Sequence, residues 1–421
     1  PLALAAEEAK PAAAAAEPPK VDTGDTAWVL ASAALVMLMT PGVALFYGGM
    51  VRTKNALSTI MQSFFIVGLI SVQWVLWGYT LAFGSDIGGV IGGFDLLGLS
   101  GVGAEPNSPT STIPHLAFMA FQGMFAVITP ALITGATADR FKFKAYAIFI
   151  ALWLVIVYAP VAHWVFGGGW LAKLGALDFA GGAVVHINAG AAALAVILVL
   201  GRRRGWPREG MHPHSLPLTL LGTGILWFGW FGFNAGSALA ANGVAAQALM
   251  NTFLAASAGM IGWLIVEQVK DGKPTTLGAA SGAVAGLGTI TPASGFVEPW
   301  HGIVIGVIAG AVCYWACTSL KHRFNYDDTL DVFGIHGIGG LLGTLMTGIF
   351  ATAAIGGTAG LIEGNPKLLL TQVYGVAVVF VWTGGMTFVL LKVVDMLAGL
   401  RVPHEHEVEG LDITQHGEAL Q

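Results

Sequence analysis

Residues 177–190 read LDFAGGAVVHINAG and place one histidine inside an apolar segment. Asp178 is suited to cap a helix start, and the small residues at 180–183 let another helix approach closely. His186 then lies about two turns into the segment. An ionisable side chain within a membrane span is energetically costly, and by default it suggests a transport path.

A second stretch, LDVFGIHGIGG at residues 330–340, holds His336 in a similar setting. The two stretches together suggest a pore lined by a pair of histidines. For His186 or His336 alone, a core ring bonded to a backbone carbonyl is an equally good interpretation. The pair therefore needs support from the rest of the chain.

The composition is that of a polytopic membrane protein. Of 421 residues, 55% are hydrophobic and 10% are charged, and the mean hydropathy is +0.73. The polar groups of such a chain could not cover the surface of a soluble protein. The net charge is −5 and the basic residues stand scattered between apolar spans, which argues against a nucleic-acid partner. Cys313 and Cys317 are interpreted as packing residues, and no metal site is expected.

Hydropathy divides the chain into three parts. Residues 1–25, which begin PLALAAEEAK, are interpreted as a signal-peptide remnant and an extracytoplasmic lead-in. Residues 26–398 form the predicted membrane domain, and residues 399–421 form a C-terminal tail. Eleven spans are predicted, each able to cross about 30 Å of hydrocarbon. Their expected limits are 26–49, 57–83, 114–137, 145–165, 180–200, 216–238, 244–267, 276–293, 300–320, 331–354 and 369–398.

The basic residues predict the orientation of these spans. One alternate set of connections holds nearly all the Lys and Arg residues, and the other side keeps only Lys10, Lys20, Lys173 and Lys367. Basic loops stay in the cytoplasm. We therefore expect the N-terminus outside and the C-terminus in the cytoplasm, as an odd number of spans requires.

Similar fragments recur in the two halves in the same order. ITP occurs in span three at 128–130 and in span eight at 290–292, and the histidines fall in spans five and ten. Spans one to five and six to ten are therefore predicted to be two copies, the second inverted, followed by a final long helix. His186 would lie about 12 Å below the outer boundary of a hydrocarbon core of about 30 Å. His336 would lie about 12 Å above the inner boundary. His186 and His336 are thus expected to meet near the midplane.

These stretches resemble the ammonium transporter family, the Amt, Mep and Rh group, and most closely its bacterial and archaeal Amt branch. The resemblance runs from about Thr26 into the tail. Its most specific motifs are DFAGGAVVHINAG at 178–190, AFQGMFAVITP at 120–130, WFGWFGFNAGS at 227–237 and DVFGIHGIGG at 331–340. The resemblance implies an all-α homotrimer in the plasma membrane, the inner membrane of a bacterium, with one pore in each subunit. It implies a transporter rather than an enzyme, without a cofactor.

The resemblance also implies roles for pore side chains. His186 and His336 match paired pore histidines whose rings share a hydrogen bond. Phe125 and Phe233 match two stacked rings that close the outer mouth. Asp178 matches an acidic residue that gives structural and electrostatic support.

The same resemblance implies an external ammonium site at the mouth. Ser237 matches its hydroxyl, and Phe125 and Phe166 contribute rings. Trp230 is counted with this site as a neighbouring aromatic of the pore wall. Bacterial relatives usually have Trp where this chain has Phe166, and Phe offers a weaker face to a cation.

Solvation chemistry gives this arrangement a function. Ammonium and potassium have similar size and charge, but only ammonium can donate hydrogen bonds and lose a proton. An apolar lumen rejects intact cations, whereas neutral ammonia can pass along the histidines. The predicted function is ammonium recruitment, deprotonation and ammonia conduction, with methylammonium as an analogue. The alternatives are a sensor or receptor with low flux, or a Rh-type channel for ammonia or carbon dioxide.

Two charged segments outside the spans complete the expectations. The tail RVPHEHEVEGLDITQHGEAL resembles a segment that packs on the cytoplasmic face of relatives, links subunits and receives a PII-type nitrogen-signalling protein. Its turn is expected at residues 410–412, and an ordinary disordered tail is the alternative. Before span ten, Asp327, Asp328 and Asp331 are expected to form a solvated turn.

Overall fold

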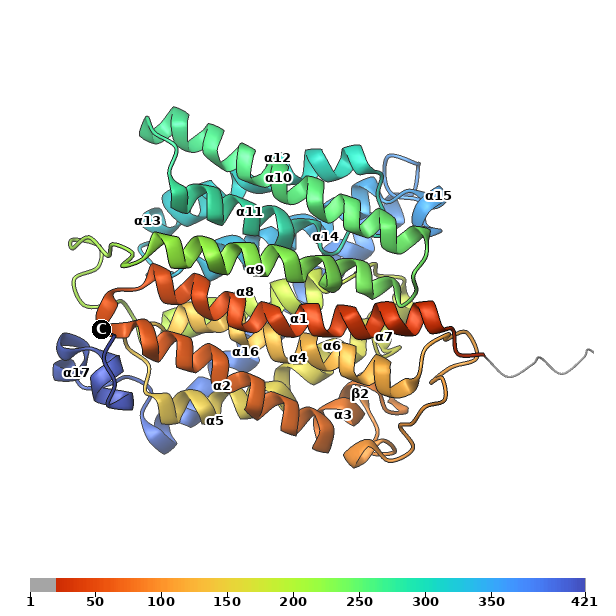
Figure 1. The fold of residues 1–421 in the computed structure, drawn as a ribbon, viewed down its shortest axis with the longest axis horizontal. Coiled ribbons are helices and arrows are strands. Elements are labelled where there is room, and N and C mark those ends of the chain that lie inside the picture. The colour runs from red at the N-terminus through yellow and green to blue at the C-terminus, as the bar shows by residue number, and fades with distance from the viewer. Residues whose placement is uncertain (1–19, 421) are drawn as a thin grey trace, which may run out of the picture.

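The computed structural model describes residues 20–420, which are almost entirely helical. Ten helical segments in this part are long and apolar enough to cross a membrane, and α11 (Thr276–Ile290) is a shorter apolar helix. Together they correspond to the eleven spans expected from hydropathy. They run side by side along the long axis of the molecule (Figure 1). The predicted signal-peptide remnant lies largely outside the described residues.

Several spans are continuous α-helices, and others contain a π-helical turn. The elements in chain order are α1 (Thr23–Met50), η1 (Thr53–Asn55), α2 (Ala56–Gln73), η2 (Trp74–Gly78), α3 (Tyr79–Phe83), β1 (Asp86–Ile87), β2 (Ile91–Gly92), η3 (Leu97–Leu99), α4 (His115–Thr137), α5 (Phe143–Trp153), η4 (Leu154–Tyr158), α6 (Ala159–Val165), α7 (Trp170–Leu174), η5 (Gly182–Ile187), α8 (Asn188–Leu200), α9 (Leu216–Ala235), η6 (Gly236–Ala238), α10 (Gly243–Asp271), α11, α12 (Pro299–Trp315), η7 (Ala316–Leu320), α13 (Lys321–Phe324), η8 (Phe333–Gly337), α14 (Ile338–Phe350), α15 (Ala353–Gly356), α16 (Pro366–Ala398), α17 (His404–Glu409) and η9 (Asp412–His416).

The predicted limits agree with the helices to within four residues; span ten ends at Phe350 rather than at 354, and span eight also ends early. Its helix was expected to reach residue 293, but α11 ends at Ile290. The backbone carbonyl of Pro292 accepts a hydrogen bond from the N–H of Phe179 at 3.1 Å. The chain has left the helical path at Pro292, and its carbonyl bonds the segment before span five.

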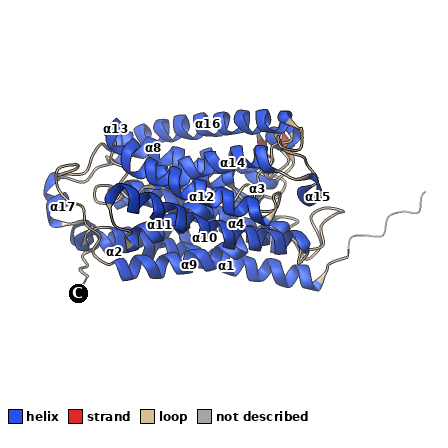
Figure 2. Ribbon diagram, turned by 90° about the horizontal axis from the view of Figure 1, so that it is seen from above, coloured by secondary structure: helices blue, strands red, loops and turns tan. Residues whose placement is uncertain are grey.

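The two halves of the bundle meet through corresponding spans. The first span of each half, α1 and α9, pack along each other on one side of the bundle, and α16 covers the opposite side (Figure 2). The fifth span of each half begins with a π-helical turn that carries the histidine, followed by an α-helix of 13 residues, α8 or α14. The halves thus share a local structure as well as an order of fragments.

Glycine brings spans five and ten into backbone contact. A methyl group added to Gly190 would lie 2.2 Å from the Cα atom of Gly337. Such closeness is possible only without a side chain, and small residues allow this packing where helices associate in lipid. The contact holds the two histidine-bearing spans against each other.

Loops and short elements gather at the two ends of the bundle. The start of α1, the hairpin of β1 and β2, and α15 lie at one end, whereas α17 and the end of the described chain lie at the other (Figure 1). The chain therefore enters and leaves the bundle at opposite ends. This agrees with an odd number of spans.

Candidate functional site

The two predicted histidines form a buried pair at the crossing of spans five and ten. Nδ1 of His186 lies 3.2 Å from Nδ1 of His336, so one nitrogen donates a hydrogen bond and the other accepts it. The rings are nearly parallel, at 10°, and both side chains are buried. Nε2 of His186 has no hydrogen-bond partner among the described residues. It is available to a molecule beside the pair.

An aspartate anchors the start of each histidine-bearing turn. Asp178 accepts hydrogen bonds from four backbone N–H groups, at residues 181–184. Asp328 accepts bonds from the N–H groups of Val332 and Gly334, each at 3.0 Å. Both carboxylates satisfy backbone donors that a helix start leaves free. Asp178 thus lies at the start of η5, where it caps the turn that carries His186.

Burial affects the protonation of both aspartates, which lie outside the spans. Desolvation raises the pKa of the Asp178 carboxyl above its usual value, and the four backbone donors oppose that rise. Desolvation and the negative charge of Asp331 raise the pKa of Asp328 to about 7. The backbone donors around each carboxylate favour the charged form.

Two aromatic rings lie next to the histidine pair. The ring of Trp230 stacks on His186, with centroids 5.4 Å apart and planes at 10°. Its Nε1 donates to Oγ1 of Thr291 at 2.9 Å, which fixes the indole. The ring of Phe233 lies 6.1 Å from His186. The structure therefore places Trp230 beside the histidines, although the expectation grouped it with the external site.

A stacked pair of phenylalanines extends the row of rings that starts at the two histidines, and this row is called the aromatic series below. The rings of Phe125 and Phe233 lie 4.3 Å apart with planes at 17°, and both side chains are buried. The rings of Phe166 and Phe125 form a T-shaped pair with centroids 6.5 Å apart, and Phe166 is partly exposed. The hydroxyl of Ser237 donates to the carbonyl of Phe233 at 2.9 Å and is also partly exposed. The structure brings these four predicted residues together at one end of the series.

The turn that carries Phe166 is fixed to the hairpin of β1 and β2. His163, one turn earlier and fully buried, bonds the carbonyl of Ala82 and a carboxylate oxygen of Asp86, each at 2.9 Å. Asp86 also accepts a bond from Lys173. These partners lower the pKa of Asp86 to about 2, so the carboxylate is charged at neutral pH. Phe166 therefore sits on a rigid turn.

The expectation of a solvated turn at the three aspartates before span ten was wrong for two of them. Asp327 and Asp328 are buried. The carboxylate of Asp327 pairs with the guanidinium of Arg203, with Oδ1 at 2.7 Å from Nη2, and also accepts from the backbone N–H of Arg203. A buried carboxylate needs such a partner. The run of arginines at 202–204 was the available signal, but sequence spacing did not show that the two loops meet.

The tail folds back against the bundle. The carboxylate of Asp412 accepts hydrogen bonds from the N–H groups of Leu57 and Ser58, the free donors at the start of α2. The N–H of Leu411 donates to Oδ1 of Asn55 at 2.8 Å. Gly410 has a φ of 117°, which supports the turn expected at residues 410–412.

Known ammonium transporters are similar to this chain. The model of the Ammonium Transporter Family matches residues 27–420. The ammonium transporter of Bacillus subtilis is 52% identical over 397 residues, which cover 94% of this chain and 98% of that protein. The crystal structure of Saccharomyces cerevisiae Mep2 is 38% identical, with a TM-score of 0.86, and covers 92% of this chain and 89% of that chain.

A solved structure described as a sensor Amt protein is also similar. It is 30% identical, with a TM-score of 0.87, and covers 93% of this chain and 98% of that chain. The family model spans nearly the whole chain, and the identity to curated transporters is high across it. The chain belongs to the ammonium transporter family.

Proposed function

We propose that this chain recruits ammonium at a mouth formed by Phe166 and Ser237, where ammonium gives one proton to water, and that it conducts the resulting ammonia past His186 and His336. The observation that carries the proposal is the order of the side chains. A partly exposed ring and hydroxyl come first, then the stacked pair of Phe125 and Phe233, then the buried histidines. A polar entrance, an apolar barrier and a polar lining thus follow one another.

The mouth has the chemistry to hold a small cation. A ring face attracts a cation by about 0.5–2 kcal/mol, depending on how far the cation is desolvated. The Ser237 oxygen donates its own hydrogen to the carbonyl of Phe233, so its lone pairs can accept a hydrogen bond from ammonium. Potassium has no hydrogen to donate, so it cannot form this hydrogen bond with the Ser237 oxygen.

The stacked rings and the histidines favour the neutral species. The transfer of an ion from water to an apolar interior costs several kcal/mol or more of free energy, whereas the transfer of ammonia costs little. Ammonium can avoid that cost by losing a proton, and potassium cannot. His186 and His336 then give ammonia a hydrogen-bond partner within the apolar passage. The free Nε2 of His186 supports this role.

Asp178 is proposed as support rather than as a ligand. Its two carboxylate oxygens are occupied by four backbone N–H groups at the start of η5. Its charge stabilises the turn that aims His186 at His336. We therefore expect Asp178→Ala to destabilise this turn and so to move His186 away from His336.

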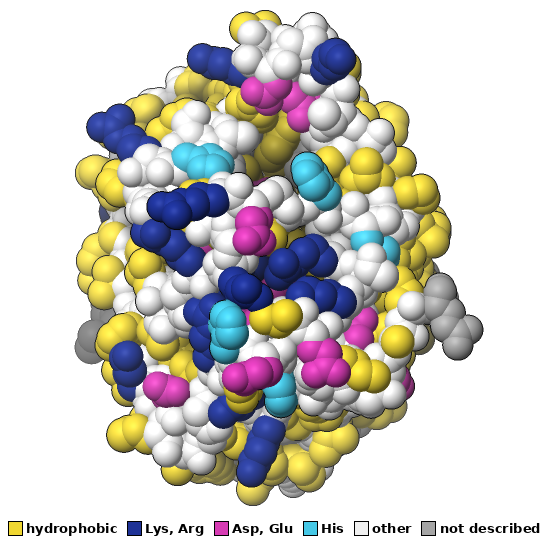
Figure 3. Space-filling model, turned by 90° about the vertical axis from the view of Figure 1, so that its left-hand side faces the viewer, with side chains coloured by type: hydrophobic (Ala, Val, Ile, Leu, Met, Phe, Trp, Pro, Cys, Tyr) yellow, Lys and Arg dark blue, Asp and Glu magenta, His cyan; other side chains and the backbone are white. Residues whose placement is uncertain are grey.

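The distribution of charge supports an orientation in the membrane. Lys and Arg side chains gather on the end of the molecule that carries α17 (Figure 3). We propose that this end faces the cytoplasm, that the start of α1 is extracytoplasmic, and that the membrane is the plasma membrane, the inner membrane of a bacterium. We further propose a homotrimer and a PII-type nitrogen-signalling partner at the basic end, as the family resemblance implies.

Substitution of the pore histidines tests the transport mechanism. We expect His186→Ala and His336→Ala to lose selective ammonium flux while the protein still folds, because each change removes one member of the buried polar pair. Uptake of radiolabelled methylammonium by cells, with the amount of each variant measured in the membrane, provides the readout. Wild-type uptake by both variants would reject the proposed role of the pair.

A sensor with low flux is the second candidate, supported by the similarity to the sensor Amt protein. Electrophysiology on solid-supported membranes with the purified protein in liposomes separates the two functions. A transporter that moves charge gives a transient current after a jump in ammonium concentration. A sensor binds ammonium without a sustained charge movement, and a Rh-type channel gives ammonia flux without current.

A further inference from the structure

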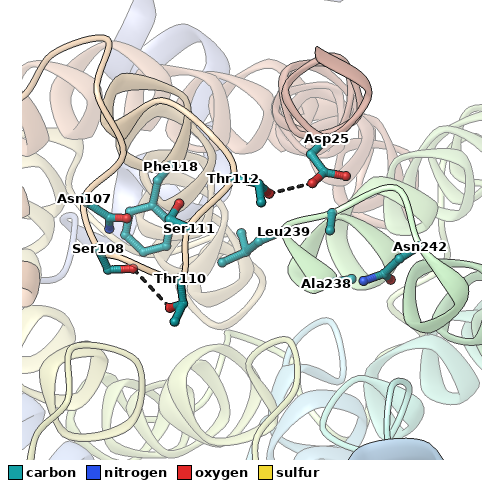
Figure 4. Close-up of a pocket in the computed structure, with 11 residues that line it drawn as sticks. Asp25, Asn107, Ser108, Thr110, Ser111, Thr112, Phe118, Ala238, Leu239 and Asn242 are labelled. Carbon is teal, nitrogen blue, oxygen red and sulfur yellow. Dashed lines mark hydrogen bonds between the residues drawn. The ribbon is translucent and has the colours of Figure 1, made fainter. Parts of the chain in front are cut away.

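A cavity of about 660 Å³ lies at the end of the bundle proposed as outer (Figure 4). It is bordered by the start of α1, residues 107–112, and the segment between η6 and α10. Its wall includes the carboxylate of Asp25, the ring of Phe118 and polar side chains such as Thr112 and Asn242. Within residues 20–420, no Lys or Arg contributes to this wall.

Asp25 is the charged side chain of the wall as formed by the described residues. Its carboxylate accepts bonds from the hydroxyl of Thr112 at 2.5 Å and from the N–H of Ala241 at 2.8 Å. Among residues 20–420 it forms no ion pair with a basic side chain. A carboxylate has about four acceptor positions. Two bonds therefore leave Asp25 able to accept hydrogens from a cation in the cavity.

The cavity adjoins the proposed mouth. Leu239, in its wall, lies two residues after Ser237. Phe118 lies on α4 two turns before Phe125, about 10 Å along the helix axis. A second cavity of about 400 Å³ shares Phe118 with the first and extends to Phe166. The cavity beside Asp25 and the cavity beside Phe166 thus share wall residues at the outer end of the bundle.

We propose that this cavity is an antechamber where a small hydrated cation, ammonium or methylammonium, collects beside Asp25 before it enters the mouth. The inference rests on the proposed transport function. Water fills about 30 Å³ per molecule, so the cavity can hold a cation with its hydration shell. Asp25 attracts potassium as well as ammonium, because the contact is electrostatic. The antechamber therefore raises the local cation concentration, and selectivity stays with the rings and histidines.

Asp25→Asn tests this role. The amide oxygen can still accept from the N–H of Ala241, and the amide NH2 group can donate to the hydroxyl of Thr112, but the charge is gone. In cells at low ionic strength, we expect the KM for methylammonium uptake to rise about two- to fivefold with little change in Vmax. The difference should disappear in about 0.3 M impermeant salt, because salt screens exposed charges. Asp25→Glu keeps the charge and should keep the wild-type KM.

Asp22→Asn is the matched control. Asp22 lies at the same helix start and caps it, but it does not line the cavity. An unchanged KM in Asp25→Asn, an equal rise in both Asn variants, or a rise that persists at high salt would each overturn the antechamber. Preference for ammonium over potassium should be the same in every variant. If His186→Ala abolishes uptake while Asp25→Asn behaves as wild type, the antechamber is rejected and the pore mechanism stands.

Discussion

At the scale of single residues, Phe166 sets the strength of the proposed external site. Its ring forms a T-shaped pair with that of Phe125 and is partly exposed. Trp offers a stronger face to a cation. We expect Phe166→Trp to lower the KM for methylammonium about two- to tenfold, in line with about 0.5–1.5 kcal/mol of added attraction. Concentration-dependent uptake of labelled methylammonium measures the change.

Phe94→Trp is the control for that substitution. Phe94 is 69% exposed and lies outside the lining of both outer cavities. It adds an indole at the same end of the molecule without adding one to the mouth. If Phe166→Trp leaves the KM unchanged, or if Phe94→Trp lowers it equally, Phe166 does not face the recruited cation.

The sequence predicted the contact between the two histidines, because the inverted repeat sets their depths. It did not predict the burial of Asp327, because that contact joins two loops. Equal depths of His186 and His336 in inverted spans predicted their meeting, and the rings are in contact. The burial of Asp327 was missed because its partner Arg203 lies on another loop. The family resemblance grouped Trp230 with the mouth as a pore-wall aromatic, and its ring stacks on His186 and lies 5.6 Å from that of Phe233.

At the scale of elements, the tail is attached through the start of α2. Asp412 caps the free N–H groups of Leu57 and Ser58. Loss of such a cap costs about 0.5–2 kcal/mol. We therefore expect Asp412→Ala to release α17 and η9, which would raise hydrogen exchange and protease cleavage in residues 404–416 while the spans stay protected.

Glu418→Ala provides the comparison, because Glu418 is an exposed acid in the same tail whose side chain makes no hydrogen bond within the described residues. It should leave exchange in the tail unchanged. Equal protection of the tail in the Asp412→Ala protein would show that the contact with α2 does not hold it. Hydropathy predicted the length of the spans but not this attachment, nor the π-helical turns at η5 and η8, because both depend on hydrogen-bond geometry.

At the scale of the whole molecule, the two halves must approach closely for the histidines to bond. Gly190 and Gly337 meet at that crossing, and a methyl group on Gly190 would lie 2.2 Å from the Cα atom and 2.3 Å from the backbone nitrogen of Gly337. Backbone atoms cannot rotate away as side-chain atoms can. Overpacking of this kind costs about 1–3 kcal/mol and separates the elements involved.

Gly190→Ala should therefore lower the Tm of the purified protein in detergent and abolish methylammonium uptake, because it moves His186 away from His336. Gly384→Ala, within α16, is the matched change, since nothing lies within 4 Å of its added methyl group. Alanine favours a helix over glycine by about 1 kcal/mol, so Gly384→Ala should keep or raise the Tm and retain uptake. Full uptake by Gly190→Ala would mean that ammonia crosses without contact between the halves at this point, and the passage would have to be sought away from the histidine pair.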